Sequence, residues 1–156
     1  MKFVQHNVNR TREVLFSILE ISLENKVDIL LLQELYTLKI SGQYIIIQYS
    51  VFYTISPELN PSVYRPRVLM YIRKNAKIQF NFRYNIYNDL DIQIIKITGI
   101  EEPFLIYNIY NKKQQTITPA TATANSKPLH IIERFLLNNQ IIIPTLLAEN
   151  FNLYHT

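Results

Sequence analysis

The segment around residue 30 constrains the fold more than any other part of the chain. Residues 29–32 form an uninterrupted apolar run that follows Asp28 and closes on Gln33 and Glu34. A run without polar alternation is typical of a strand buried on both faces, as in a sheet covered by helices. We therefore expect a layered fold with this strand at its centre.

The preceding segment has the periodicity of a helix. Its apolar residues recur at helical spacing: Val14, Leu15, Ile18, Leu19 and Ile21. Asn9 or Thr11 can cap the start of this helix, and Asn25 with Lys26 can end it. Together with a short strand at residues 2–6, the pattern predicts a strand-helix-strand beginning.

The middle of the chain is rich in β-branched and aromatic residues between turn residues, which predicts strands. We expect them at residues 44–48, 51–55, 68–73, 78–82, 92–98 and 104–110. After a polar stretch at 112–128, a helix at 129–137 and a last buried strand at 141–148 are expected. The elements indicate an α/β (α+β) layered fold, with residues 1–156 as a single domain.

Length and composition exclude several classes of protein. A chain of 156 residues buries roughly 70% of its extended surface on folding, so it needs no metal or disulfide staple. The absence of Cys excludes a disulfide framework, thiolate zinc sites, Cys nucleophiles and iron–sulfur clusters. We expect an intracellular protein that is not secreted, because no signal-peptide core or membrane-length apolar run occurs. The net charge of +4 weakly favours polyanionic partners.

Polar residues follow several predicted strands at their carboxyl ends. They are Asn7, Glu34, Tyr110, Glu149, Asn150 and Asn152. In open α/β sheets, ligand sites lie at the carboxyl ends of strands, and oxygen ligands without Cys suit Mg²⁺ or Mn²⁺ better than zinc. Such residues also commonly cap helices or begin turns, and their spacing alone leaves both interpretations open.

The polar residues belong to segments that occur in a characteristic order. These are QHNVNR, DILLLQELYT, YRPRVLMYIRK, IYNIYN and PTLLAENFNLYH. Together they resemble the endonuclease/exonuclease/phosphatase superfamily, most of all the apurinic-type endonuclease domains at the front of non-LTR retrotransposon (reverse transcriptase) polyproteins. The resemblance implies a two-sheet β-sandwich flanked by helices. It also implies a divalent-metal phosphodiesterase site at the strand ends, DNA as the partner and a nuclear location.

The resemblance assigns roles to individual residues. Asn7 matches the Asn that contacts the scissile phosphate and the metal shell, and Glu34 matches the metal-binding Glu. Tyr110 resembles the active-site Tyr, and Asn152 matches an Asn that holds the phosphate. In this chemistry a carboxylate holds the cation, the cation offsets charge on the phosphoryl oxygens, and neutral donors contact the non-bridging oxygens.

The chain departs from the family pattern in two places. The family's Gly-Asp is Glu149-Asn150 here, so an amide that cannot accept a proton stands where the water-activating carboxylate is expected. Loss of a general base typically costs about 10² to 10⁴ in rate. The family's later strands, with an Asp and a closing Asp-His pair, would lie beyond Thr156. We therefore expect a partial, C-terminally truncated domain that exposes an apolar sheet edge or face, completed by a downstream segment or a second chain.

Basic residues flank the strand predicted at 68–73 and open the polar stretch. They are Arg65, Arg67, Arg73, Lys112 and Lys113. They can track a phosphate backbone, or form a solvated charged rim. The leading hypothesis is a Mg²⁺-dependent endonuclease-type domain acting on DNA and impaired in this chain. The alternatives are a non-catalytic nucleic-acid-binding remnant and a decayed reading frame without a stable fold.

Overall fold

A computed structural model describes residues 1–55, 65–82, 91–110 and 144–149. Within them the chain forms these elements: β1 (Phe3–Asn7), α1 (Arg12–Glu24), β2 (Ile29–Gln33), β3 (Thr37–Ile40), β4 (Gln43–Ile46), β5 (Phe52–Ile55), β6 (Val68–Arg73), β7 (Gln79–Phe82), β8 (Ile92–Thr98), β9 (Phe104–Ile109) and β10 (Thr145–Glu149). The helix predicted at 129–137 and the first part of the strand predicted at 141–148 lie outside the described residues.

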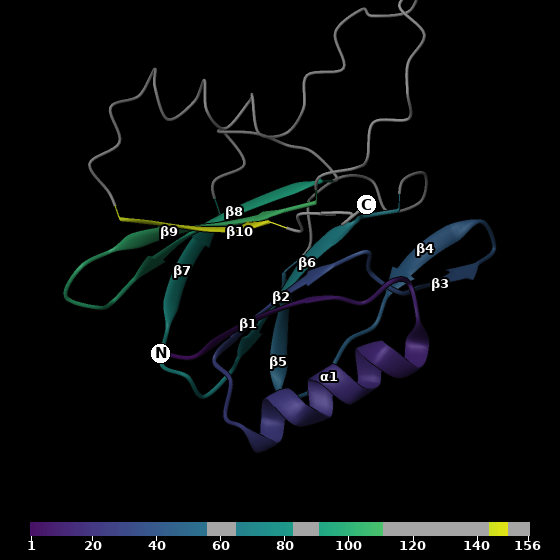
Figure 1. Ribbon diagram of the computed structural model, residues 1–156, viewed down its shortest axis with the longest axis horizontal. Helices are drawn as coiled ribbons and strands as arrows, with labels where there is room; N and C mark the ends of the chain where they lie inside the picture. Colours follow the sequence, from purple (N-terminus) through teal and green to yellow (C-terminus); the bar gives the residue numbers. More distant parts are fainter. Residues whose placement is uncertain (56–64, 83–90, 111–143, 150–156) are drawn as a thin grey trace, which may run out of the picture.

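The strands form two four-stranded sheets and a separate ribbon (Figure 1). The first sheet has the order β1-β2-β6-β5, the second has the order β10-β9-β8-β7, and β3 pairs with β4 alone. A layered α/β fold with two sheets is thereby confirmed.

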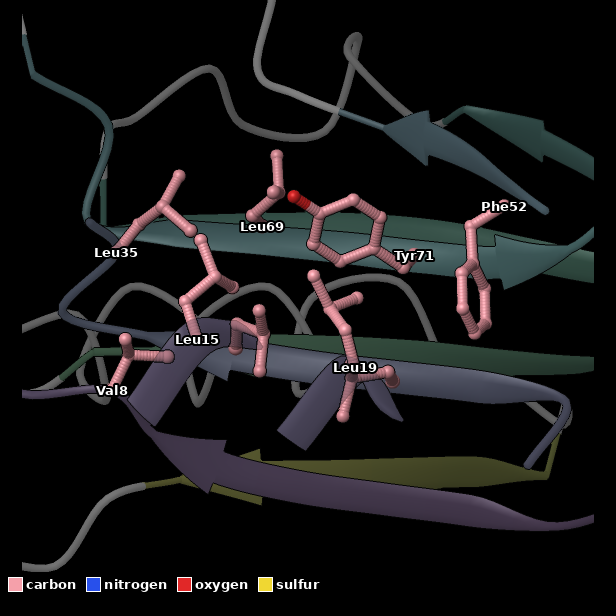
Figure 2. Close-up of a cluster of buried hydrophobic side chains, with 9 residues drawn as sticks. Val8, Leu15, Leu19, Leu35, Phe52, Leu69 and Tyr71 are labelled. Carbon is pink, nitrogen blue, oxygen red and sulfur yellow. The ribbon is translucent and has the colours of Figure 1, made fainter. Parts of the chain in front are cut away.

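Helix α1 covers the outer face of the first sheet. Leu15 and Leu19 are fully buried and point at the sheet, where they pack against Leu69 and Tyr71 of β6 (Figure 2). Thr11 is the N-cap residue, but its hydroxyl donates to the Asn9 carbonyl (3.1 Å) instead of capping the helix. The helix therefore depends on its apolar face more than on its cap.

Strand β2 is buried along its whole length, as the apolar run predicts. Leu30 and Leu32 face α1, whereas Ile29 and Leu31 pack in the cluster that contains Ile106 of the second sheet. The apolar run alone suggested helices on both faces, but a sheet covers the second face, as in the two-sheet sandwich that the resemblance implies. An apolar run records burial on both faces, but not whether a helix or a sheet provides the cover.

The register brings particular strand ends to one edge of the sandwich. β1 runs parallel to β2, with Asn7 opposite Gln33, and β10 runs parallel to β9. β6 is antiparallel to β2 and β8 is antiparallel to β9. The carboxyl ends of β1, β2, β9 and β10 therefore meet the amino ends of β6 and β8, and we call this edge the polar edge.

The ribbon β3-β4 contains a strand that was not predicted, β3. Its two-residue turn places Ser41 at a φ of 50° and Gly42 at a φ of 82°. Two positive φ values match the tight hairpin turn that follows the natural twist of the strands. Elsewhere, β10 lies at one end of the second sheet as described, and exposes Leu146 and Leu147.

Candidate active site at the polar edge

Two strained turns place Asn7 and Glu34 beside each other. The chain leaves β1 through Asn9 and Arg10, both at positive φ (49° and 57°), and leaves β2 through Glu34 at a φ of 48°. The turns are joined by the Val8 amide on the Gln33 carbonyl and by the Arg10 amide on the Glu34 carbonyl, both at 2.8 Å. Non-glycine residues at positive φ are strained, and such strain gathers at functional sites.

The side chain of Asn7 is held by its own turn. Its Oδ1 accepts a hydrogen bond from the Asn9 amide at 2.8 Å. An amide oxygen has two lone pairs, so one remains for a further donor or a cation. Asn7 thus presents a fixed oxygen next to the end of β2.

Tyr110 connects the second sheet to Glu34. Its hydroxyl donates to Glu34 Oε1 at 2.6 Å, and its ring is almost fully buried. Burial, followed by the hydrogen bond to the Glu34 carboxylate and its charge, raises the pKa of Tyr110 to about 12. At neutral pH the phenol is therefore protonated, so it can donate a proton in a hydrogen bond but cannot act as a base.

Arg67 and Asp91 lie against the same tyrosine. Arg67 stands just before β6, forms an ion pair with Asp91, and places its Nη2 2.5 Å from Asp91 Oδ2. Its guanidinium carbon lies 5.5 Å from the centre of the Tyr110 ring. The Tyr110 amide also donates to the Asp91 carbonyl at 2.8 Å.

A second arginine, Arg65, lies near Glu34. Arg65 Nη2 donates to the Leu35 carbonyl at 3.0 Å. Burial and then the positive charge of Arg10 lower the pKa of Arg65, while the charge of Glu34 opposes this. Arg10, Arg65 and Glu34 therefore interact electrostatically, and within the described part of the chain neither arginine forms an ion pair with a carboxylate.

Buried amides fix the distance between the two sheets next to the site. Gln33 Nε2 donates to the Ile109 carbonyl at 2.8 Å. Asn108 Nδ2 donates to the carbonyls of Leu32 (3.1 Å) and Leu69 (3.0 Å). Both side chains are buried, so these bonds form in a medium where a lost partner is costly. They hold the end of β9 against the ends of β2 and β6.

The structure assembles part of the predicted set. Asn7, Glu34, Tyr110, Arg65 and Arg67 all lie at the polar edge. The remaining described member, Arg73, is at the opposite end of β6, where it pairs with Asp28.

Other predicted members lie outside the described residues: Lys112, Lys113, Asn150 and Asn152. Sequence reasoning missed Arg10, Asp91, Gln33 and Asn108. Gln33 and Asn108 did carry a signal, because each is an amide at or near the end of an otherwise apolar strand.

The donor set at the polar edge fits Mg²⁺ or Mn²⁺. Asn7 and Glu34 offer a fixed amide oxygen and a carboxylate, both hard ligands. No group of three or more His, Asp or Glu side chains that could hold a metal occurs among the described residues. Mg²⁺ commonly binds through one or two carboxylates together with water and substrate phosphates, so these donor types are compatible with it. No described helix is long and apolar enough to cross a membrane.

Comparison with known proteins gives structural relatives only. No family model and no curated protein matches the chain. The endonuclease domain of TRAS1, a telomere-specific non-LTR retrotransposon, matches 98% of this chain with a TM-score of 0.68 and 12% identity. An endonuclease/exonuclease/phosphatase family protein from Leptotrichia buccalis C-1013-b matches 97% of it with a TM-score of 0.54 and 14% identity.

The matches are partial on the side of the relatives. The chain spans 59% of the TRAS1 domain and 66% of the Leptotrichia protein. The arrangement of sheets is nevertheless shared along almost the whole of this chain. The chain therefore has the fold of the endonuclease/exonuclease/phosphatase domains, of which it spans a part.

Proposed function

We propose that this chain is a Mg²⁺-dependent endonuclease-type domain that hydrolyses a DNA phosphodiester, at a rate reduced by Asn150. The observation that supports this most is the contact of the Tyr110 hydroxyl with the Glu34 carboxylate. It unites residues from the two sheets at the polar edge, where the sequence motifs place the site. The fold shared with endonuclease domains supports the same reaction class. A nuclear location would follow from it.

Glu34 and Asn7 would hold the cation, which would offset negative charge on the phosphoryl oxygens and the leaving oxygen. Tyr110 keeps its proton and orients the Glu34 carboxylate through the 2.6 Å hydrogen bond. Hydrogen bonds to a charged group are worth about 1.5 to 3 kcal/mol, enough to keep this carboxylate in one position.

Arg10 and Arg65 would hold the DNA backbone beside Glu34. Both lack a carboxylate partner among the described residues, and the two like charges interact with each other. A phosphodiester anion between them would relieve that repulsion and satisfy their N–H donors. The DNA strand would then run past Glu34 along the polar edge.

Water activation is the weak step of the proposed reaction. Asn150 carries an amide where a carboxylate would accept the proton. Tyr110 does not replace it, because its hydroxyl donates its hydrogen to the Glu34 carboxylate. Asn150 also favours a second function, non-catalytic binding of nucleic acid by the same edge.

The test is nicking of supercoiled plasmid in Mg²⁺. We expect slow nicking by the parent chain, loss of nicking in Glu34→Gln, and unchanged nicking in Glu20→Gln. Glu20 is an exposed carboxylate on α1, so Glu20→Gln removes the same charge at a position away from the site. Circular dichroism melts on the same samples report folding.

Two results would contradict the proposed hydrolysis. One is nicking that persists unchanged in Glu34→Gln, which would indicate a contaminating nuclease or another site. The other is a cooperatively folded parent chain that does not nick; salt-sensitive DNA binding by that sample would support the non-catalytic function.

A further inference from the structure

The ion pair of Arg67 and Asp91 is the best-defined unit at the polar edge that the proposed reaction does not use. The side chains are 26% and 11% exposed, so the pair is largely shielded from water. Two nitrogens of the guanidinium, Nε and Nη2, face the two carboxylate oxygens. Paired contacts of this kind fix the plane of the guanidinium as well as its position.

The guanidinium lies over the ring of Tyr110, with 5.5 Å between the guanidinium carbon and the ring centre. A guanidinium over an aromatic face is attracted by the ring's electron density. Asp91 also accepts the Tyr110 amide at 2.8 Å through its carbonyl. Tyr110 is therefore held by two contacts: its backbone amide binds Asp91, and its ring packs against Arg67.

The contacts join three separate strands. Arg67 precedes β6 of the first sheet, Asp91 precedes β8 and Tyr110 follows β9 of the second. Beyond the ring, the Tyr110 hydroxyl reaches Glu34, which follows β2. The chain of contacts thus runs from Asp91 through Arg67 and Tyr110 to Glu34.

The other end of β6 offers an internal comparison. Arg73 also forms an ion pair, through its Nη2 on Asp28 Oδ1, and its side chain is similarly shielded, at 18% exposed. Within the described residues Arg73 does not stack on a ring. An ion pair that only joins strands does not require contact with an aromatic ring. The contact of Arg67 with the Tyr110 ring therefore indicates a role beyond joining strands.

We propose that Arg67, held in place by Asp91, is a positioning residue that fixes the Tyr110 ring so that its hydroxyl meets the Glu34 carboxylate. The guanidinium contacts Asp91 and Tyr110. Arg67 therefore acts through Tyr110, and not by contacting a phosphate as proposed for Arg65. The catalytic consequence rests on the proposed nuclease function. The positioning itself is independent of that function.

The primary experiment observes Tyr110 without requiring activity. 3-Fluorotyrosine is placed at position 110 alone, and its ¹⁹F resonance is recorded in the parent chain, Arg67→Gln, Arg67→Lys, Asp91→Asn and the matched control Arg73→Gln. We expect one sharp resonance in the parent and in Arg73→Gln. In Arg67→Gln and Asp91→Asn the resonance should move and show a larger H₂O/D₂O shift, because the ring gains exposure to water.

Arg67→Lys keeps the charge but loses the planar fork, so its resonance should also move. If Arg67→Gln does not melt cooperatively, Arg67→Lys decides the result. An unchanged ¹⁹F resonance in the folded Arg67 variants would overturn the proposal. So would an equal change in Arg73→Gln, because the effect would then be a general loss of strand pairing.

A kinetic measurement separates positioning from phosphate binding. We expect Arg67→Gln to lower kcat for plasmid nicking about tenfold, with KM nearly unchanged. A raised KM with an unchanged kcat would mean that Arg67 binds phosphate, which overturns the proposal. If the parent chain does not nick, the hydrolysis fails, while the ¹⁹F result still decides whether Arg67 positions Tyr110.

Discussion

Asn108→Ala tests whether the buried amide holds the two sheets together. The residue is fully buried, and its Nδ2 donates to the Leu32 and Leu69 carbonyls at 3.1 and 3.0 Å. Each of the two hydrogen bonds contributes about 1 kcal/mol net, and the space left by the truncated side chain in the interior adds to the loss. We therefore expect the free energy of unfolding to fall by about 2 to 4 kcal/mol. For a chain of this size the midpoint temperature should drop on the order of 10 °C.

Urea denaturation followed by circular dichroism measures this change, with Asn81→Ala as the control. Asn81 is an exposed asparagine on β7 of the same sheet, so its removal should change the free energy of unfolding by less than about 0.5 kcal/mol. The urea dependence should stay the same in all three proteins if both states keep their compactness. A loss in Asn108→Ala no greater than in Asn81→Ala would refute the reasoning that this amide joins the sheets.

Three further predictions follow from single residues. Burial opposes the charged form of Asp28, but hydrogen bonds from Arg73 and a backbone amide outweigh it and set its pKa below the usual 3.8. The stability that this lowered pKa contributes is complete above about pH 4 and is lost as the pH falls through the lowered pKa. In Asp28→Asn the urea midpoint should therefore fall less steeply at acid pH than in the parent chain. An unchanged fall of the midpoint would contradict this. Arg65→Gln should reduce the slope of log Kd for duplex DNA against log salt concentration by about 0.9, whereas the control Arg12→Gln on α1 should leave it unchanged. Fluorescence anisotropy measures both slopes. Equal slopes in the two variants would show that Arg65 does not contact DNA. Asn150→Asp should accelerate plasmid nicking by about 10² to 10⁴, and an unaltered rate would show that position 150 does not activate water.

Most described elements could be predicted because the spacing of their apolar residues reflects which positions are buried. β6 and β8 begin and end at the predicted residues, and α1 covers the predicted periodic segment. β3 was missed because it is short and only its first residue is buried. The Ser41-Gly42 turn was the local signal for it.

The candidate site was predicted in part, and the limit lies in strand direction. Arg65, Arg67 and Arg73 flank one strand and are indistinguishable as sequence. Because β6 runs antiparallel to β2, the residues before it reach the polar edge and Arg73 lies at its other end, about 20 Å away at 3.3 Å per residue. Asp91 had no signal, because a lone acidic residue before a strand is ordinary.

The sequence by itself determined most of the described strands and the helix α1, and it singled out Asn7, Glu34 and Tyr110 through ordered motifs. These are local properties, set by periodicity and by side-chain chemistry within a few residues. Only the tertiary structure decided which strands face each other across the two sheets, and that the Tyr110 hydroxyl reaches Glu34 at 2.6 Å. The contact of Tyr110 with Glu34 joins residues 76 positions apart, and such contacts depend on how separately formed strands pack, which no local pattern specifies.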